Sequence, residues 1–145
     1  MVISLASPLH VGIYEQHSLI DAHIMYEQTS EALPKAFETL LKTYIPKRLF
    51  FARGPGSFMS IKISYIFLKT LSIAFGIPLY GSDGFTFNEG HPIKAMRQLY
   101  FVKCDEKIET RTFETAQEQR FKLPQILDES SFSDANEPLY MLPAV

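Results

Sequence analysis

The residues best placed to do chemistry form one turn, Gly54-Pro55-Gly56-Ser57. The turn follows an apolar run at residues 48–52, which predicts a buried strand, and precedes a long stretch free of helix breakers. Glycines permit positive φ angles, and backbone amides at the start of a helix can hold an anion. The turn could therefore be a phosphate-binding loop, a nucleophile elbow, or a tight connection between a strand and a helix.

Three known motifs test the first two of these readings. A P-loop needs a lysine directly after its last glycine, but Ser57 and Phe58 follow Gly56. The dinucleotide fingerprint needs a third glycine that the chain lacks, and Ser57 is not flanked as the serine of a G-x-S-x-G elbow is. We therefore interpret the turn mainly as a structural device that launches a helix, with Ser57 as its N-cap, and leave anion binding by its amides open.

The other reactive residue types show no spacing typical of a site. His10, His17, His23 and His91 lack the spacing of metal ligands, and Cys104 has no second cysteine near it. The carboxylates are scattered or lie in expected loops, where no acid and base pair would be buried. The sequence predicts no catalytic residue, no metal site and no cofactor bound by this chain itself.

Size and composition favour a small globular protein. The 145 residues suffice for one domain with a small appendage, and 46% hydrophobic with 21% charged residues is typical of soluble proteins. A net charge of −2 gives no basic field for tRNA or an anionic membrane. Lys62 and Lys69 interrupt the best apolar run, so we expect no membrane span. With a single cysteine and no signal-peptide pattern, we expect a cytoplasmic protein.

The order of predicted elements indicates a mixed α/β fold. We expect a hairpin within residues 2–15, a strand at 18–26, a helix at 30–44, a strand at 48–52, a helix at 58–75 and a strand at 77–80. Turns are expected at residues 81–84 and 90–92, and a second hairpin from strands at 98–104 and 108–113. Residues 128–137 are polar enough for a mobile loop, and the apolar residues 138–143 should dock back on the body.

The helix at residues 58–75 has more apolar surface than one sheet can cover. At about 100° per residue, Ile61, Leu68, Leu71 and Phe75 face the sheet, and Lys62 and Lys69 fall on a stripe away from it. Three apolar residues lie beside those lysines. We call this set the lysine flank: Met59, Lys62, Ile66, Lys69 and Ile73. A helix that is apolar nearly all round is buried on more than one side, so the flank should be covered by another helix of this chain or by a second protein.

Several stretches of the chain resemble the TsaB family, also called YeaZ. Residues 52–58 (ARGPGSF), followed by AFGIPL at residues 74–79, are similar to the family's GPGSFTGLR-type turn and its helix ending in GIPL. The start of the preceding helix at residues 30–34 resembles an HSExLLP-type segment, and residues 138–140 resemble the family's usual ending. The resemblance covers residues 2–84, with the tail as weaker support.

The resemblance implies an actin-like, ribonuclease-H-like fold in residues 1–84 and a reduced second subdomain in residues 85–145. It implies a non-catalytic subunit that binds and activates the transferase TsaD, alongside the ATPase TsaE, in forming N6-threonylcarbamoyladenosine at position 37 of tRNAs. ATP and metal would then be bound by those partner subunits. The interface with TsaD, or with a second copy in a homodimer, would come from helices 30–44 and 58–75. This assigns Leu33, Phe37 and the lysine flank to a partner.

Departures from the family pattern bear on the alternatives. Ala6 occupies the position of an acidic residue in the family's first strand, and Met59 and Lys62 stand where the family has threonine and arginine. A stand-alone nucleotide hydrolase or glycoprotease-like peptidase would need a metal-binding carboxylate or an activated nucleophile, which Ala6 and Ser57 do not supply. A degenerate relative that only homodimerises stays open.

Overall fold

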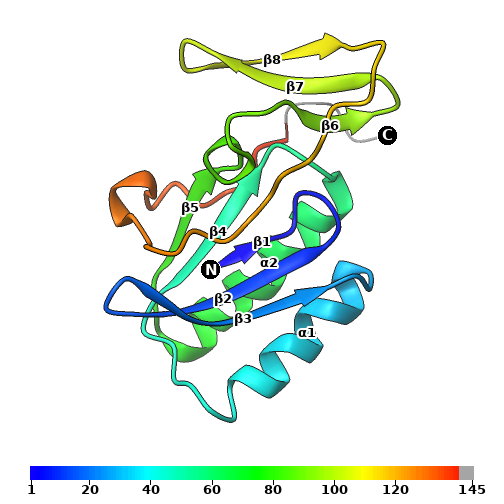
Figure 1. Cartoon of the computed structure of the whole chain (residues 1–145). Helices are drawn as coiled ribbons and strands as arrows, with labels where there is room; N and C mark the ends of the chain where they lie inside the picture. Colours follow the sequence, from blue (N-terminus) through cyan, green and yellow to red (C-terminus); the bar gives the residue numbers. More distant parts are fainter. Residues whose placement is uncertain (141–145) are drawn as a thin grey trace.

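The main body is a five-stranded mixed sheet (Figure 1). The computed structural model describes residues 1–140. The strands are β1 (Val2–Ile3), β2 (Leu9–Glu15), β3 (Ser18–Met25), β4 (Leu49–Gly54) and β5 (Leu79–Asp83), in the order β3-β2-β1-β4-β5. β4 runs parallel to β1 and β5, whereas β2 is antiparallel to β1 and β3. The opening hairpin and the third strand are therefore confirmed, and the sheet is of the predicted mixed kind.

Two helices cover one face of this sheet: α1 (Thr29–Leu40) and α2 (Phe58–Phe75) (Figure 1). Their inward side chains form one core with the sheet, in which Leu33, Phe51 and Leu68 are fully buried. α2 has the predicted bounds because Gly76 adopts the left-handed conformation, at φ 65°, that ends a helix.

α1 is shorter than predicted. It ends at Leu40, where the Thr43 amide donates to the Leu40 carbonyl in a tighter turn, at 3.1 Å. Leu41 and Tyr44 nevertheless pack against the same core, and the Tyr44 hydroxyl reaches Asp21 on β3, at 3.1 Å. The apolar spacing of residues 33–44 thus records which side chains reach the core, and it does not require the backbone between them to stay helical.

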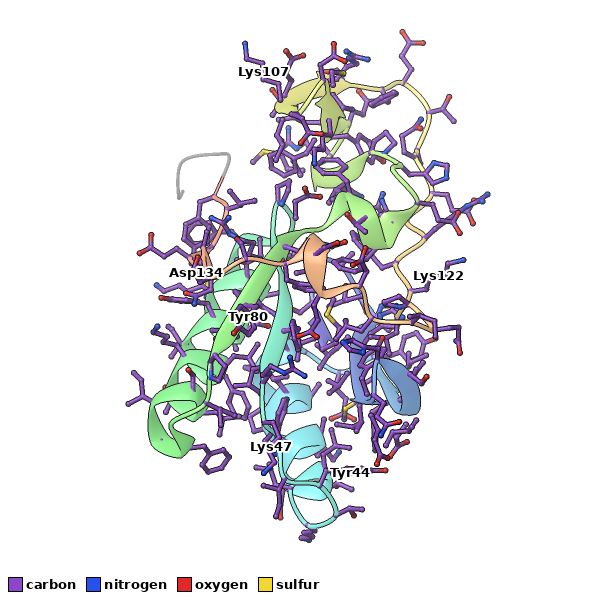
Figure 2. All side chains as sticks on the ribbon, turned by 90° about the vertical axis from the view of Figure 1, so that its left-hand side faces the viewer. Tyr44, Lys47, Tyr80, Lys107, Lys122 and Asp134 are labelled. Atoms are coloured by element: carbon purple, nitrogen blue, oxygen red, sulfur yellow. The ribbon has the colours of Figure 1, made fainter. Side chains whose placement is uncertain are left out.

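A smaller antiparallel sheet stands at one end of the main sheet. It consists of β6 (Ile93–Met96), β7 (Leu99–Cys104) and β8 (Lys107–Thr112), in that order. Figure 2 shows Lys107 at the far end of the molecule from Tyr44. The predicted hairpin is confirmed, whereas the sequence missed β6.

Two features join the small sheet to the main one. A second core contains Ile3 and Leu5 from the first part of the chain together with Ile93 and Phe101 from the second. In addition, Lys103 on β7 donates to Asp83 on β5, at 2.6 Å. The prediction of a turn at residues 81–84 is wrong, because Gly81 to Asp83 complete β5 and a one-turn helix at Phe85–Asn88 comes next.

The chain after β8 crosses the second face of the main sheet, opposite the helices (Figure 1). At the β3 edge the Leu19 amide donates to the Gln125 carbonyl, at 3.0 Å. At the β5 edge Gly81 and Ser133 exchange two backbone hydrogen bonds, at 2.9 and 3.0 Å. The mobile loop predicted for residues 128–137 is therefore incorrect, because this segment forms a short helix at Glu129–Ser131 and then pairs with β5.

The tail docks on β4 as predicted. The Leu139 amide donates to the Arg53 carbonyl, at 2.8 Å, and the Tyr140 ring packs on Phe58 with centroids 4.5 Å apart. Residues 141–143, the rest of the predicted docking segment, lie outside the described residues.

Candidate partner-binding surface

The turn Gly54–Ser57 is filled by the chain itself. Gly54 has φ +132°, and a Cβ there would lie 2.7 Å from the Leu139 carbonyl oxygen. A Cβ on Gly56 would lie 2.7 Å from the Cβ of Leu5, and the Ser57 amide donates to the Leu5 carbonyl, at 2.9 Å. A carbonyl oxygen beside Gly54 repels an anion, so the geometry favours the structural reading: the turn brings β1, β4 and the tail together.

Ser57 occupies the N-cap position of α2, as predicted, but not through its side chain. Its carbonyl accepts the first helical hydrogen bond, from Ile61 at 3.0 Å, whereas its hydroxyl makes no capping bond. The predicted mechanism of capping is therefore wrong.

The other titratable groups that the structure brings together tie segments to one another. Glu129 of the C-terminal segment contacts both His17, in the β2–β3 turn, and Arg48, before β4. The hydrogen bond from His17, followed by the charge of Arg48, lowers the pKa of the Glu129 carboxyl. Likewise the hydrogen bond to Asp83 raises the pKa of Lys103. Within residues 1–140, no three His, Cys, Asp or Glu side chains cluster as a metal site requires.

The lysine flank lies on the outer surface of α2. Met59, Ile66 and Ile73 are 59%, 54% and 73% exposed, Lys62 is exposed and Lys69 is half-buried. Only Ile61, Ser64 and Leu68 of this helix are buried. The three exposed apolar residues recur at a spacing of seven, which places them along one seam of the helix. No other described segment covers them to the extent that apolar residues of a packed helix are normally covered.

Leu33 and Phe37, which the resemblance assigned to the interface, are core residues. Leu33 is fully buried, and the buried Phe37 ring packs on Phe67 of α2 with centroids 5.2 Å apart. Because α1 turns this stripe towards the sheet and α2, neither side chain is available to a partner in this structure. The sequence pattern located the buried face of α1, and the assignment to a partner is corrected.

Phe75 was predicted to face the sheet but is 49% exposed. At 1.5 Å per residue α2 is about 27 Å long, whereas the six residues of β4 span only about 20 Å. α2 is therefore longer than the strand it covers, and Phe75, at its end, belongs to neither hydrophobic core of the described residues.

A groove of about 520 Å³ adjoins the lysine flank at the first turns of both helices. Its walls share Met59 with the flank and include Tyr26, which is 80% exposed. The Thr29 hydroxyl donates to the Ser60 hydroxyl at 3.1 Å and so holds the two helix starts together. Sequence reasoning missed Tyr26, because one aromatic residue after a strand carries no periodic signal.

A second hollow, of about 570 Å³, lies at the opposite end of the sheet. Residues 40–50, the β2–β3 turn and Glu129 line it. Tyr44 and Lys47 mark this end of the molecule in Figure 2. Its ionic groups are largely those already engaged between Glu129, His17 and Arg48, and it shares no residue with the lysine flank.

α2 is also apolar enough to raise the question of a membrane. Its 18 residues have a mean hydropathy of 1.4, which meets the length and composition of a membrane span, so the sequence argument from Lys62 and Lys69 was too strong. The structure holds this helix against the sheet: Ile61 and Leu68 lie in the two cores, and the Ser4 and Ser64 hydroxyls share a buried hydrogen bond of 2.6 Å.

Comparison with solved structures places this fold among known ones. YeaZ from Pseudomonas aeruginosa matches with a TM-score of 0.59 at 12% sequence identity, over 81% of this chain and 63% of that one. A second structure is described as an uncharacterized protein with similarity to peptidase YeaZ from Pseudomonas aeruginosa. It matches with a TM-score of 0.56 at 14% identity, over 90% of this chain and 70% of that one. No protein-family model and no curated protein sequence matches the chain.

The chain thus has the actin-like, ribonuclease-H-like fold of YeaZ, and the resemblance seen in its sequence is confirmed at the level of the fold. Its aligned part spans 63% of the length of the first of these structures.

Proposed function

We propose that this protein is a cytoplasmic, non-catalytic subunit that binds and activates a TsaD-like transferase through the lysine flank of α2. In this role it supports the formation of N6-threonylcarbamoyladenosine at position 37 of tRNAs. The observation that carries the proposal is the exposed seam of Met59, Ile66 and Ile73 on a helix whose other side is buried. The YeaZ-like fold and the turn and helix motifs support the choice of partner.

The spacing of the seam favours a helical partner. Apolar residues every seven positions fit the groove of another helix packed at a shallow angle. Complete burial of each of the three side chains would contribute about 1.5–3 kcal/mol. Lys62 and Lys69 border the seam, so the matching partner surface is an apolar stripe edged by acidic side chains.

A role in activating a partner does not require catalytic residues in this chain. Ala6 lies in the bend after β1, at the position where the family pattern has an acidic residue, and no described histidine is hydrogen-bonded to the exposed Ser57. In this proposal ATP and metal are held by the partner subunits, including a TsaE-like ATPase. The competing function, a nucleotide hydrolase or peptidase, requires turnover by the purified chain that Ser57→Ala abolishes.

The decisive experiment measures the affinity of this protein for the TsaD-like subunit of the same organism. We expect Ile66→Glu and Met59→Glu each to weaken binding by at least about tenfold, because a buried unpaired carboxylate replaces an apolar contact. The fold should be unaffected, because both positions are exposed.

Ile45→Glu is the matched control, because Ile45 is 83% exposed and lies outside α2. It should bind as the unchanged protein does. The proposal would be contradicted if the protein did not associate with the TsaD-like subunit and cells lacking the gene kept normal levels of the modified nucleoside.

A further inference from the structure

The second hollow, at the end of the main sheet where β4 begins, has the size of a small-molecule site. Its volume of about 570 Å³ lies within the usual range of such sites, about 300–1,000 Å³. Tyr44 and Lys47, which Figure 2 labels, are two of its lining residues. No residue of α2 lines it, so binding of a partner to the lysine flank leaves this hollow without a role.

The inner wall of the hollow is apolar. Side chains from β2, α1, β4 and the C-terminal segment form it, and those buried deepest are at most 7% exposed: Val11, Phe37, Leu40, Leu49 and Leu127. An apolar group that enters against these side chains leaves water and gives up no hydrogen bond. The wall therefore suits the apolar body of a ligand.

The rim of the hollow is charged. His17, Lys47 and Arg48 line it together with two carboxylates, Glu15 and Glu129. Glu129 is half-buried, and the other four side chains are exposed. An apolar wall behind a charged rim fits an amphipathic molecule, with its body inside and a polar head group at the rim.

The rim already binds one carboxylate, which belongs to the chain itself. His17 Nε2 and Arg48 Nη1 each donate to a different oxygen of Glu129. The hydrogen bond from His17, followed by the charge of Arg48, lowers the pKa of Glu129, so the two donors favour an ionised carboxylate. Two donors directed at the two oxygens of one carboxylate recognise both its charge and its shape.

The remaining charges of the rim favour an anion over a cation at this point. In the part of the chain that the structure describes, Lys47 takes part in no ion pair, so it adds a positive charge next to Arg48 in the sequence. Glu15 is not paired with either of them. Its charge acts on Tyr44, whose pKa is raised by burial, then by Asp21 and then by Glu15. A cationic head group would meet two like charges at the rim.

We propose that this hollow binds a small amphipathic carboxylate, whose apolar body lies against the inner wall and whose head group takes the place of Glu129 between His17 and Arg48. Glu129 is then an internal competitor. Because it belongs to the same chain, its effective concentration is high and it weakens the affinity for an external carboxylate. Binding releases the ion pair that ties the C-terminal segment to the start of β4.

This proposal does not depend on the proposed function. Ile66→Glu on the lysine flank should leave ligand binding unchanged, because α2 does not line the hollow. Arg48→Met should in turn leave the affinity for the TsaD-like subunit unchanged. The two sets of variants therefore separate failure of one proposal from failure of the other.

The test is an NMR titration of the full chain with octanoate, which gives both the affinity and the place of binding. We expect saturable shifts of the backbone amides of Leu49 and Leu127, and none at Ile66. From hexanoate to decanoate the affinity should rise about fourfold for each methylene group that the wall covers. Octanol and octylamine, which lack the carboxylate, should each bind at least about tenfold more weakly.

Two substitutions at the rim have opposite expected effects on octanoate binding. Arg48→Met removes a donor to the head group and should weaken binding at least about tenfold. Glu129→Gln removes the competing charge and should strengthen binding at least about threefold. Lys42→Met is the matched control, because Lys42 is exposed and does not line the hollow, and it should bind as the unchanged protein does.

The same spectra show whether each variant is folded. The proposal would be overturned by the absence of saturable shifts, by shifts centred on α2, by equal affinities for octanol and octanoate, or by weaker octanoate binding in the folded Glu129→Gln variant.

Discussion

His10 is an ionisable side chain in a buried position. It is 6% exposed on β2, between Ile3 and Ile24, and its Nδ1 has no hydrogen-bond partner within residues 1–140. Burial lowers the pKa of His10 below its ordinary 6.5, and a contact with the Pro8 carbonyl opposes this only in part. The fold therefore favours the neutral imidazole, and lowering the pH should destabilise the folded protein at this position.

The sign follows from proton counting. Below pH 6.5 the unfolded chain binds a proton at His10 more readily than the folded protein does. The contribution of His10 to the free energy of unfolding is therefore constant well above pH 6.5 and decreases as the pH falls below it. We expect the unchanged protein to lose stability relative to His10→Leu on going from pH 7 to pH 5, with a slope of at most about 1.4 kcal/mol per pH unit. Urea unfolding of both proteins across this range measures the difference, and parallel curves would contradict the assignment.

At the scale of the elements, the strand–turn–helix unit from β4 to α2 depends on its glycines more than on its serine. Gly54→Ala combines a strained φ of +132° with a Cβ only 2.7 Å from the Leu139 carbonyl oxygen. Gly76→Ala carries only backbone strain, at φ +65°, because nothing lies within 4 Å of its Cβ. We expect Gly76→Ala to cost about 1–2 kcal/mol and Gly54→Ala more.

Urea unfolding of the two variants gives this comparison directly. Ser57→Ala should change stability by less than about 0.5 kcal/mol, because its hydroxyl makes no capping bond. Equal costs for Gly54→Ala and Gly76→Ala would mean that the tail does not pack on the turn.

The same elements show which features a sequence can reveal. α2 was predicted to the residue because Ser57, Gly76 and Pro78 mark its ends locally. Helical spacing placed Met59, Ile66 and Ile73 away from the sheet, but it left open whether another helix of the chain covers them, and the structure shows them exposed. The end of α1 was missed because Leu41 and Tyr44 continue the apolar period beyond the helix. Residues 81–84 were misread as a turn because the two glycines of this stretch make room for neighbours: Gly81 for the segment at Ser133, and Gly84 for Leu5.

On the scale of the whole molecule, an irregular segment, rather than a second layer of helices, covers the second face of the main sheet. Residues 113–120 lie along the small sheet, and the chain from Phe121 to Ser133 crosses the second face of the main sheet. The contacts of this segment lie far away in the sequence, such as Leu127 with His17 and Leu139 with Arg53. An irregular segment has no period of its own, so its path could not be predicted from the sequence. Leu123, which is 8% exposed, packs beside Gly12 of β2.

The path of this segment can be tested through one contact. An ideal Cβ on Gly12 would lie 3.0 Å from Leu123 Cδ1, so Gly12→Ala overfills the place where Leu123 packs. We expect Gly12→Ala to cost about 1–3 kcal/mol and Leu123→Ala about 2–4 kcal/mol in the free energy of unfolding.

The double variant tests this contact, because Leu123→Ala removes two of the three atoms nearest to the new methyl group and leaves only Leu19 Cδ1, at 3.1 Å. The loss in the free energy of unfolding of the double variant should then be smaller than the sum of the two single losses by at least about 0.5 kcal/mol, because the effects of residues in contact are not additive. Leu123→Ala combined with Gly76→Ala is the control, in which the costs should add because nothing lies within 4 Å of the Gly76 Cβ. If the losses for Gly12→Ala and Leu123→Ala were additive, Leu123 would not pack on Gly12, and the path of this segment over β2 would be contradicted.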